Sequence, residues 1–535
     1  MFHFPKPIAI LAIFATFLAL GIWLFIPSSN ALFTSDDFVL MTQIREGKWQ
    51  FFSDFGVGSQ HYWRPLVLAS LEILPSNTAA HHLYLNTVLH LSLVAIIYAC
   101  CRLRGARSLH AAFVAFVFMV HWSNATNVYW VSARTDLLSC FFLGVALLSY
   151  FAMKRWRSYG WVIAALFSFG CALLSKEHAV MFPFIVCVFW MWDNRGAWRW
   201  GWLTSMPTCE KLFWLILPLL KITYLMILRL CLYQGASSPV PGQPATMVVN
   251  SIKSAMYAVL PLPVAILGKG WAAALALVLV SAIWFVAHSA RRKGLESYRV
   301  LFTGMVLFFL AGAPMLVFLN QSAPRLIYMP LAVTLIFLGS VFSGWPRASI
   351  PVLAAVGLVL VAGSTMEKAL WQENMALARQ CQNQFKQVME GKNPQQPFVL
   401  LGAPATRKGH LVFGNDMNHA LFFATYGRFG SFPNGAAVGQ IDWPGGPLRV
   451  EGGYGDEVYS RCISAPASYR FDPKAKAGDR FTYGPGETVV VDLFRPGQCR
   501  CLSFRFHKAL QVQTPLVFDF DGENLVNLTP FPRSD

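Results

Sequence analysis

The chain has 535 residues, of which 55% are hydrophobic, 15% aromatic and 13% charged, and its mean hydropathy is +0.47. This composition excludes an ordinary soluble domain and indicates a polytopic membrane protein. The net charge of +17 comes largely from short basic segments between apolar runs, where Lys and Arg set membrane topology, so we discount nucleic-acid binding.

Apolar runs suited to membrane spans recur from the N-terminus to about residue 363. The first, 8–26, is long for a signal-peptide core and lacks a small-x-small cleavage site, so we interpret it as a retained helix. With it, we predict about eleven spans, several of them shorter than the ~20 residues that a bilayer needs. The other runs are 83–101, 109–121, 137–153, 161–174, 180–192, 212–232, 271–288, 300–319, 326–342 and 350–363.

The distribution of Lys and Arg predicts the orientation of these spans. If the proline-interrupted segment 248–267 lies on the outer face, the N-terminus and five basic loops fall in the cytoplasm. These loops lie around Arg102, Lys154, Arg195, Arg291 and Arg347. The outer face then receives 27–82, 122–134, 175–178, 234–270, 320–325 and everything after about residue 364.

The composition changes after residue 364, where the chain becomes polar and rich in Gly and Pro. Strand-like runs at 398–401, 488–492 and 516–520 follow a predicted helix at about 366–389. We therefore predict an α-helical transmembrane domain over 1–364, with 27–82 as its first outer loop, and a small, mostly β exported domain over 365–535. In an oxidising compartment, candidates for disulfide pairing are Cys381, Cys462 and either Cys499 or Cys501.

An acidic pair, Asp36 and Asp37, lies just beyond the first apolar run in Thr34-Ser-Asp-Asp-Phe. Carboxylates at a membrane boundary are a functional hypothesis by default. They could cap a surface helix. Alternatively, one serves as general base on an acceptor hydroxyl while the other orients it or helps to hold a cation.

Two arginines are predicted on the same outer face. Arg64 lies in His61-Tyr62-Trp-Arg-Pro, and Arg325 lies in Ser322-Ala-Pro-Arg-Leu-Ile-Tyr. The planar donor fork of Arg suits phosphate oxygens, although an interfacial aromatic belt with a snorkelling Arg has the same pattern. Two such arginines on one face favour an anionic ligand.

Further charges fall at outer helix ends, as Arg134 with Asp136 and Lys176 with Glu177. They either pair to anchor the helix ends or line a site. His90 is predicted inside the membrane, where a core histidine hydrogen-bonded to another helix is favoured over a metal ligand.

Six motifs in order carry a family resemblance over about residues 32–330. They are the Asp-Asp pair, Trp63-Arg-Pro-Leu, Leu85-Asn-x3-His90, Ser132-Ala-Arg-Thr-Asp-Leu-Leu, Leu174-Ser-Lys-Glu and Pro324-Arg-Leu-Ile-Tyr-Met-Pro. The chain resembles the GT-C superfamily of membrane glycosyltransferases, in the branch of the TPR-bearing O-mannosyltransferases and their bacterial relatives. It is more distantly similar to protein O-mannosyltransferases and the lipid A aminoarabinose transferase. No 34-residue repeat is visible, so the acceptor stays open and we expect a bacterial inner membrane.

The resemblance implies an inverting glycosyltransferase that moves a sugar from a polyprenyl-phosphate donor to an acceptor hydroxyl on a protein, lipid or glycan at the outer face. It implies Asp36 as the base with Asp37 in support, while Arg64, Arg325 and then Lys176 stabilise the leaving phosphate. The superfamily has members with and without a divalent cation, so a metal stays open. Expected supporting residues are Arg134, Asp136, Glu177, His61, Tyr62, His90 and Tyr328.

Two alternatives use similar residues. A transporter or flippase for a lipid-linked sugar or another anion would bind phosphate with the same cations, but transporters usually place charges near the bilayer midplane on broken helices within paired halves. An O-antigen polymerase or ligase would also act on polyprenyl-linked glycans at the outer face.

Overall fold

The computed structural model of the chain describes the ranges 6–27, 31–47, 63–74, 78–195, 206–231, 244–260, 262–263, 295–317, 323–341, 350–392, 398–400, 403–408, 410–413 and 417–426, and the strands between 435 and 527. The chain divides into two compact units. The first contains Met1–Ser28, Gly47–Pro75 and Ala80–Lys368. The second contains Ser29–Glu46, Ser76–Ala79 and Ala369–Asp535, so the acidic pair belongs with the C-terminal part of the chain.

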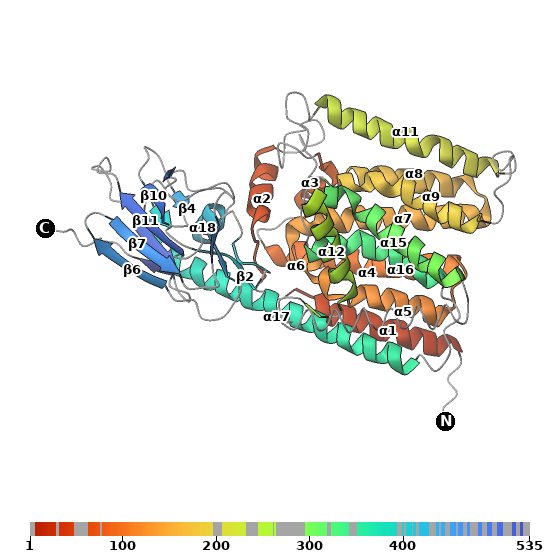
Figure 1. The fold of residues 1–535 in the computed structure, drawn as a ribbon, viewed down its shortest axis with the longest axis horizontal. Helices are drawn as coiled ribbons and strands as arrows, with labels where there is room; N and C mark the ends of the chain where they lie inside the picture. The colour runs from red at the N-terminus through yellow and green to blue at the C-terminus, as the bar shows by residue number, and fades with distance from the viewer. Residues whose placement is uncertain are drawn as a thin grey trace. The chain divides into compact units, whose positions relative to one another are not determined.

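The first unit is helical (Figure 1). Short 3-10 turns join several of its helices: η2 (Trp122–Asn124), η3 (Val131–Ala133), η4 (Glu177–Met181) and η6 (Pro324–Ile327). The helices are α1 (Lys6–Phe25), α3 (Pro65–Glu72), α4 (Ala79–Leu103), α5 (Ser108–Met119), α6 (Ala125–Tyr129), α7 (Arg134–Trp156), α8 (Tyr159–Leu173), α9 (Phe182–Asp193), α11 (Thr208–Cys231), α12 (Pro244–Val259), α15 (Leu295–Val317), α16 (Tyr328–Val341) and the first part of α17 (Ile350–Met389).

The tight connection between α7 and α8 shows how the sequence reverses the chain. Arg157 follows α7 in the left-handed region, with φ 51°, and its N–H donates to the carbonyl of Met153 at 2.8 Å. A left-handed residue at this position is a common way to end a helix. The next helix begins at Tyr159, so α7 and α8 lie side by side (Figure 1).

Several helices are suited to a membrane. By length and composition, those able to cross it among the described residues are Ala79–Leu103, Val131–Trp156, Thr208–Leu230 and Pro324–Val341. Ser108–Met119 and Trp122–Tyr129 together pass the same test but are bent by 53° at the break between them. These helices support the membrane class expected from the composition, whereas the expected span 271–288 lies outside the described residues.

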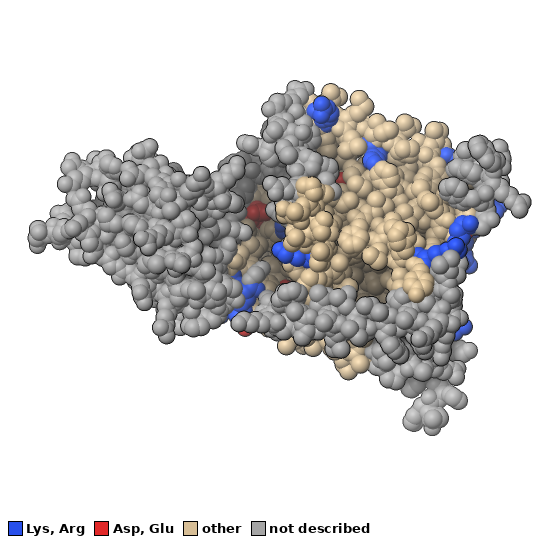
Figure 2. Space-filling model, viewed as in Figure 1, with Lys and Arg blue, Asp and Glu red and all other residues tan. Residues whose placement is uncertain are grey.

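The outward faces of these helices are apolar. Leu215 on α11, Phe167 on α8 and Phe302 on α15 are 64%, 71% and 69% exposed. Figure 2 shows a broad face of the first unit that is neither acidic nor basic. Exposing so much apolar surface to water is unfavourable, whereas contact with lipid chains, which are themselves apolar, is not.

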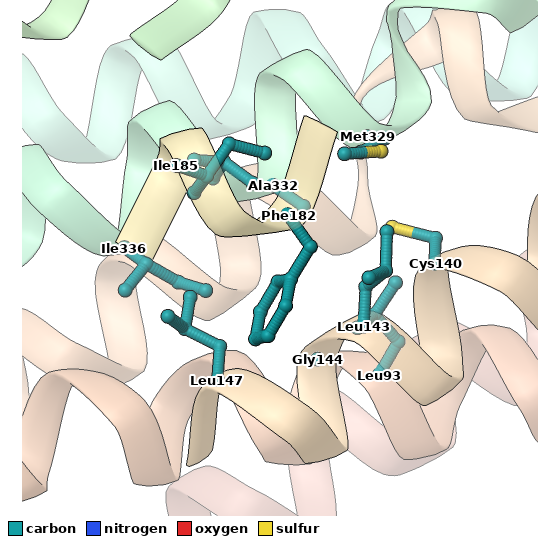
Figure 3. Close-up of a pocket in the computed structure, with 11 residues that line it drawn as sticks. Leu93, Cys140, Leu143, Gly144, Leu147, Phe182, Ile185, Met329, Ala332 and Ile336 are labelled. Carbon is teal, nitrogen blue, oxygen red and sulfur yellow. The ribbon is translucent and has the colours of Figure 1, made fainter. Parts of the chain in front are cut away.

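The core of the first unit is closely packed where α4, α7, α9 and α16 meet. A cavity of about 20 Å³ remains there, and its lining is almost wholly apolar. Figure 3 shows Leu93, Leu143, Phe182 and Ile336 converging on it. A void of this size could hold at most one water molecule and offers it few polar partners, so it is a packing defect. It is too small to hold a lipid chain.

The second unit contains α2 (Asp36–Gly47), the end of α17, α18 (Met417–Tyr426) and three sheets. The sheet orders are β13-β12-β1-β4, β6-β7-β11-β10-β9 and β3-β2-β5-β8. The five-stranded sheet is antiparallel, whereas β1 pairs in parallel with both β12 and β4. The strands are β1 (Phe398–Leu400), β2 (Ala403–Arg407), β3 (His410–Leu411), β4 (Gly435–Ala437), β5 (Gln440–Trp443), β6 (Val450–Gly455), β7 (Val458–Ile463), β8 (Ser468–Arg470), β9 (Arg480–Tyr483), β10 (Val489–Phe494), β11 (Arg500–Phe506), β12 (Leu516–Phe520) and β13 (Leu525–Asn527).

Candidate functional site

A buried ion pair joins α7 to the turn before η4. The Nζ atom of Lys176 lies 2.5 Å from Oδ1 of Asp136, and the two side chains are 6% and 7% exposed. Asp136 occupies the first turn of α7, where the helix dipole favours a carboxylate. Removing two charges from water is costly even when they pair, so this pair needs a reason beyond stability.

A second ion pair adjoins the first along the chain. Arg64 donates from Nε and Nη2 to the two carboxylate oxygens of Glu177, at 3.1 and 2.6 Å. The backbone N–H of Leu66 also donates to the carbonyl of Leu174 at 3.3 Å. The Trp-Arg-Pro-Leu and Leu-Ser-Lys-Glu motifs are therefore neighbours in the fold, although more than a hundred residues separate them.

Arg134 is fully buried and ties three helices together. Its Nε donates to Oδ1 of Asn86 at 2.9 Å, its Nη1 to the carbonyl of Ser70 at 3.0 Å, and its Nη2 to the carbonyl of His82. The amide of Asn86 in turn donates to the carbonyl of Trp130 at 3.1 Å. These contacts fix the start of α7, and with it the position of Asp136.

Arg325 brings a further cation to this end of the unit. Its guanidinium stacks on the indole ring of Trp130 with 4.3 Å to the ring centroid, and its carbonyl accepts from the amide of Asn127 at 3.1 Å. The charge of Arg325 also acts on the Asp136 carboxylate, as do those of Lys176 and a protonated His178. We call Arg64, Arg134, Asp136, Lys176, Glu177, His178 and Arg325 the charged cluster.

His90 and Tyr328 form a separate buried contact. Nδ1 of His90 lies 2.7 Å from the hydroxyl of Tyr328, and its Nε2 lies 3.2 Å from the carbonyl of Met119. Because a carbonyl can only accept, Nε2 carries the proton and Nδ1 accepts from the tyrosine. This geometry is that of the hydrogen-bonded core histidine that the sequence favours.

The pKa values of the side chains in the turn at 176–178 are shifted by burial and by the charges of neighbouring side chains. Burial lowers the pKa of the Lys176 ammonium group, although the Asp136 carboxylate opposes that shift. For Glu177, burial alone would raise the pKa, but the Arg64 guanidinium holds it below its usual value. Lys176 is therefore less basic than a solvated lysine, and Glu177 is ionised at neutral pH.

His178 is the residue of this turn that the sequence analysis did not select. Burial, aided by the nearby Lys176 charge, lowers its pKa to about 4, so its ring is neutral at pH 7. Its Nδ1 lies 4.0 Å from Oδ1 of Asp136. Among the described residues neither ring nitrogen has a hydrogen-bond partner, although the side chain is only 3% exposed. The sequence feature that could have pointed to His178 is its position directly after Lys176 and Glu177.

The two residues of the acidic pair, Asp36 and Asp37, have different surroundings. The Asp37 side chain is 1% exposed, and its Oδ2 accepts from the backbone N–H of Thr34 at 2.9 Å, like one half of a capping box. Asp36 is exposed, and Oγ of Ser35 donates to its Oδ1 at 3.1 Å. The capping interpretation thus describes Asp37, while Asp36 presents its carboxylate at the surface.

The structure assigns the selected residues to both units. Arg64, Arg134, Asp136, Lys176, Glu177, Arg325, His90 and Tyr328 belong to the first, whereas Asp36 and Asp37 belong to the second. His61 and Tyr62 lie outside the described residues. Within the part of the chain that is described, no three His, Cys, Asp or Glu side chains are grouped to hold a metal ion.

The fold and the charged cluster define a helical protein with several candidate membrane spans and a partly buried ionic network at one end of α7. No protein-family model and no curated protein matches the chain. The function is therefore argued from the chemistry of these side chains.

Proposed function

We propose that the protein is an integral-membrane inverting glycosyltransferase that uses a polyprenyl-phosphate-linked sugar. The observation that carries the proposal is the charged cluster, in which Lys176 and Arg325 both act on Asp136 while Arg64 is held by Glu177. Arg64, Lys176 and Arg325 are side chains of the kind that binds an anionic ligand such as a lipid phosphate.

The chemistry needs a base for the acceptor and cations for the leaving group. The acceptor oxygen would form a bond to the anomeric carbon as the bond from that carbon to the phosphate oxygen breaks, with inversion. Asp36 would take the acceptor proton. Fixed cations would stabilise the charge that develops on the phosphate, so no general acid is required. The supporting observation for Asp36 is its exposed carboxylate, in contrast to the engaged Asp37.

The topology that fits this activity has about eleven spans, a cytoplasmic N-terminus and an exported C-terminal domain in a bacterial inner membrane. A second group of charges supports the orientation. Arg104 donates to both carboxylate oxygens of Asp193, at 3.1 and 2.9 Å, and Lys154 lies 3.6 Å from the same residue. Lys154 is in the last turn of α7 and Asp136 in the first, so the basic loops and the proposed donor site lie at opposite ends of that helix.

The partners of the reaction would be the lipid-linked donor, the surrounding membrane lipids and an acceptor hydroxyl on a protein, lipid or glycan. A divalent cation stays open.

The test is transfer from a panel of radiolabelled polyprenyl-phosphate sugars by the purified full chain in lipid vesicles, with membrane extract as acceptor. We expect Asp36→Asn to lower the transfer rate by about 10² to 10⁴-fold while donor binding is kept, because the substitution removes a base and few contacts. Glu373→Gln, a half-exposed carboxylate of the same unit, is the matched control and should transfer normally.

Wild-type turnover by Asp36→Asn would refute the base assignment. If wild type and Asp36→Asn bind one donor equally and neither transfers it, the transporter alternative becomes the better explanation.

A further inference from the structure

The segment that carries Asp36 packs on a helix of the C-terminal domain. Residues 31–38, which we call the acidic turn, belong to the second unit. Phe423 on α18 contacts both Phe33 and Phe38, with ring centroids 5.8 and 5.9 Å apart. Phe33 and Phe38 are themselves 6.1 Å apart in an edge-to-face arrangement. The three rings form one cluster, which we call the three-ring cluster.

The three-ring cluster brackets the proposed base. Phe33 precedes Asp36 by three residues and Phe38 follows it by two, and these two phenylalanines are 4% and 1% exposed. Edge-to-face aromatic pairs have a preferred geometry in addition to their buried area. Both ends of the acidic turn are therefore held against the same side chain of α18.

The backbone of the acidic turn is strained where it meets the acidic pair. Ser35 has φ 50°, a left-handed conformation that is uncommon for residues other than glycine. Such conformations persist only where the surroundings over-determine them. The bond from the Thr34 N–H to Asp37 supplies one restraint inside the turn, and the three-ring cluster supplies another from outside it.

We propose that α18 positions the catalytic base and that Phe423 is its positioning residue. The inference rests on the proposed function, because it takes Asp36 as the base. It gives the C-terminal domain a part in the chemical step, besides any role in binding the acceptor. Phe423 would act through the acidic turn that it contacts.

The experiment compares Phe423→Ala, Phe423→Leu and Phe423→Tyr in the full chain in vesicles, with two readouts. One is hydrogen exchange of the backbone amides in the acidic turn, and the other is the transfer rate together with donor affinity. We expect Phe423→Ala to speed exchange and to lower kcat by about 10 to 10²-fold at unchanged donor affinity, because small misplacements of a reacting group are costly. Phe423→Tyr should restore both.

Phe413→Leu is the matched control for Phe423→Leu, since Phe413 is a buried phenylalanine of the same unit outside the three-ring cluster. It should leave exchange in the acidic turn unchanged. Phe423→Leu also answers the question if Phe423→Ala does not fold.

The outcomes separate this inference from the proposed function. If Phe423→Leu and Phe423→Ala leave exchange or kcat at the wild-type value while Asp36→Asn abolishes transfer, the positioning role is overturned and the base assignment stands. If the Phe423 variants loosen the acidic turn but Asp36→Asn transfers normally, the base assignment fails, and with it the catalytic purpose of the positioning.

Discussion

At the scale of single residues, Arg64 and Glu177 offer a way to separate ligand binding from structure. Arg64→Ala removes the guanidinium, whereas Glu177→Gln keeps it but weakens the ion pair. If Arg64 binds the donor phosphate, we expect Arg64→Ala to weaken donor affinity about tenfold or more, as charge-assisted hydrogen bonds are lost. Glu177→Gln should change affinity much less. Equal losses in a vesicle binding assay would mean that the pair is only structural.

His178 predicts an acid sensitivity of stability. Its pKa is about 4 in the folded chain and about 6.5 when exposed, so between these values the unfolded chain binds a proton that the folded chain does not. The contribution of neutral His178 to the free energy of unfolding is therefore fully present above about pH 6.5. It is lost as the pH drops toward 4, which lowers the free energy of unfolding by on the order of 3 kcal/mol.

The measurement is unfolding of the purified protein in detergent across pH 7 to 4. His178→Gln cannot take up a proton, so its stability should decline less than that of the wild type over this interval. Parallel declines for the two proteins would show that His178 does not titrate in this way.

The sequence identified most charges of this cluster because isolated Lys, Arg, Asp and Glu beside apolar runs are conspicuous. The pairs that it suggested, Arg134 with Asp136 and Lys176 with Glu177, differ from the ion pairs of the structure. Arg64 meets Glu177 and Lys176 meets Asp136 only because α3, α7 and the turn before η4 pack together. The buried, unsatisfied state of His178 likewise depends on its neighbours in space, and no sequence pattern reports it.

At the scale of helices, Gly339 marks a close approach of α16 to α4 and α5. A methyl group at this position would lie 2.8 Å from Cγ2 of Val114 and 3.0 Å from Sγ of Cys101. Small residues at such contacts let helices in membranes pack closely, and a valine side chain in a helix has little freedom to move aside.

We therefore expect Gly339→Ala to destabilise the protein by about 1 kcal/mol or more, measured by thermal unfolding in detergent. Gly170→Ala on α8 is the matched control, because among the described residues nothing beyond its own helix backbone lies within 4 Å of the added methyl group. It should leave stability unchanged or raise it slightly, since alanine is the better helix former. A loss as large as that of Gly339→Ala would argue against the steric cause.

Hydropathy predicted the helices of the first unit more reliably than their limits. The expected run 137–153 lies inside α7, which begins three residues earlier at Arg134 because polar contacts hold that end. The expected span 350–363 and the expected helix 366–389 are one continuous helix, α17. The sequence becomes more polar between the two expected segments. A single glycine such as Gly363 weakens a helix without ending it, and no proline lies at that point.

At the scale of the whole molecule, the five-stranded sheet offers a test of export. Cys462 on β7 and Cys501 on β11 occupy directly opposite register positions. The α-carbons of directly opposite residues in an antiparallel pair are about 4.5 to 5.5 Å apart, a separation that a disulfide can span. In an oxidising compartment we expect these two cysteines to be linked, which peptide mapping without reductant would detect.

Protein purified from cells that lack periplasmic thiol oxidation should not contain the link. Free thiols at both positions in oxidising cells would contradict an exported C-terminal domain with this register. The sequence alone left Cys381, Cys462 and either Cys499 or Cys501 as candidates for pairing, because cysteine spacing does not report strand register.

The two ion pairs of the charged cluster differ in their access to water. Arg64 and Glu177 are 22% and 27% exposed, whereas Lys176 and Asp136 are 6% and 7% exposed. The Debye length at physiological ionic strength is about 8 Å, and added salt weakens interactions between exposed charges more than those between buried charges. Rising salt would therefore weaken the Arg64–Glu177 pair more than the Lys176–Asp136 pair. An anionic ligand could then compete with Glu177 for Arg64 while Lys176 and Asp136 stay paired.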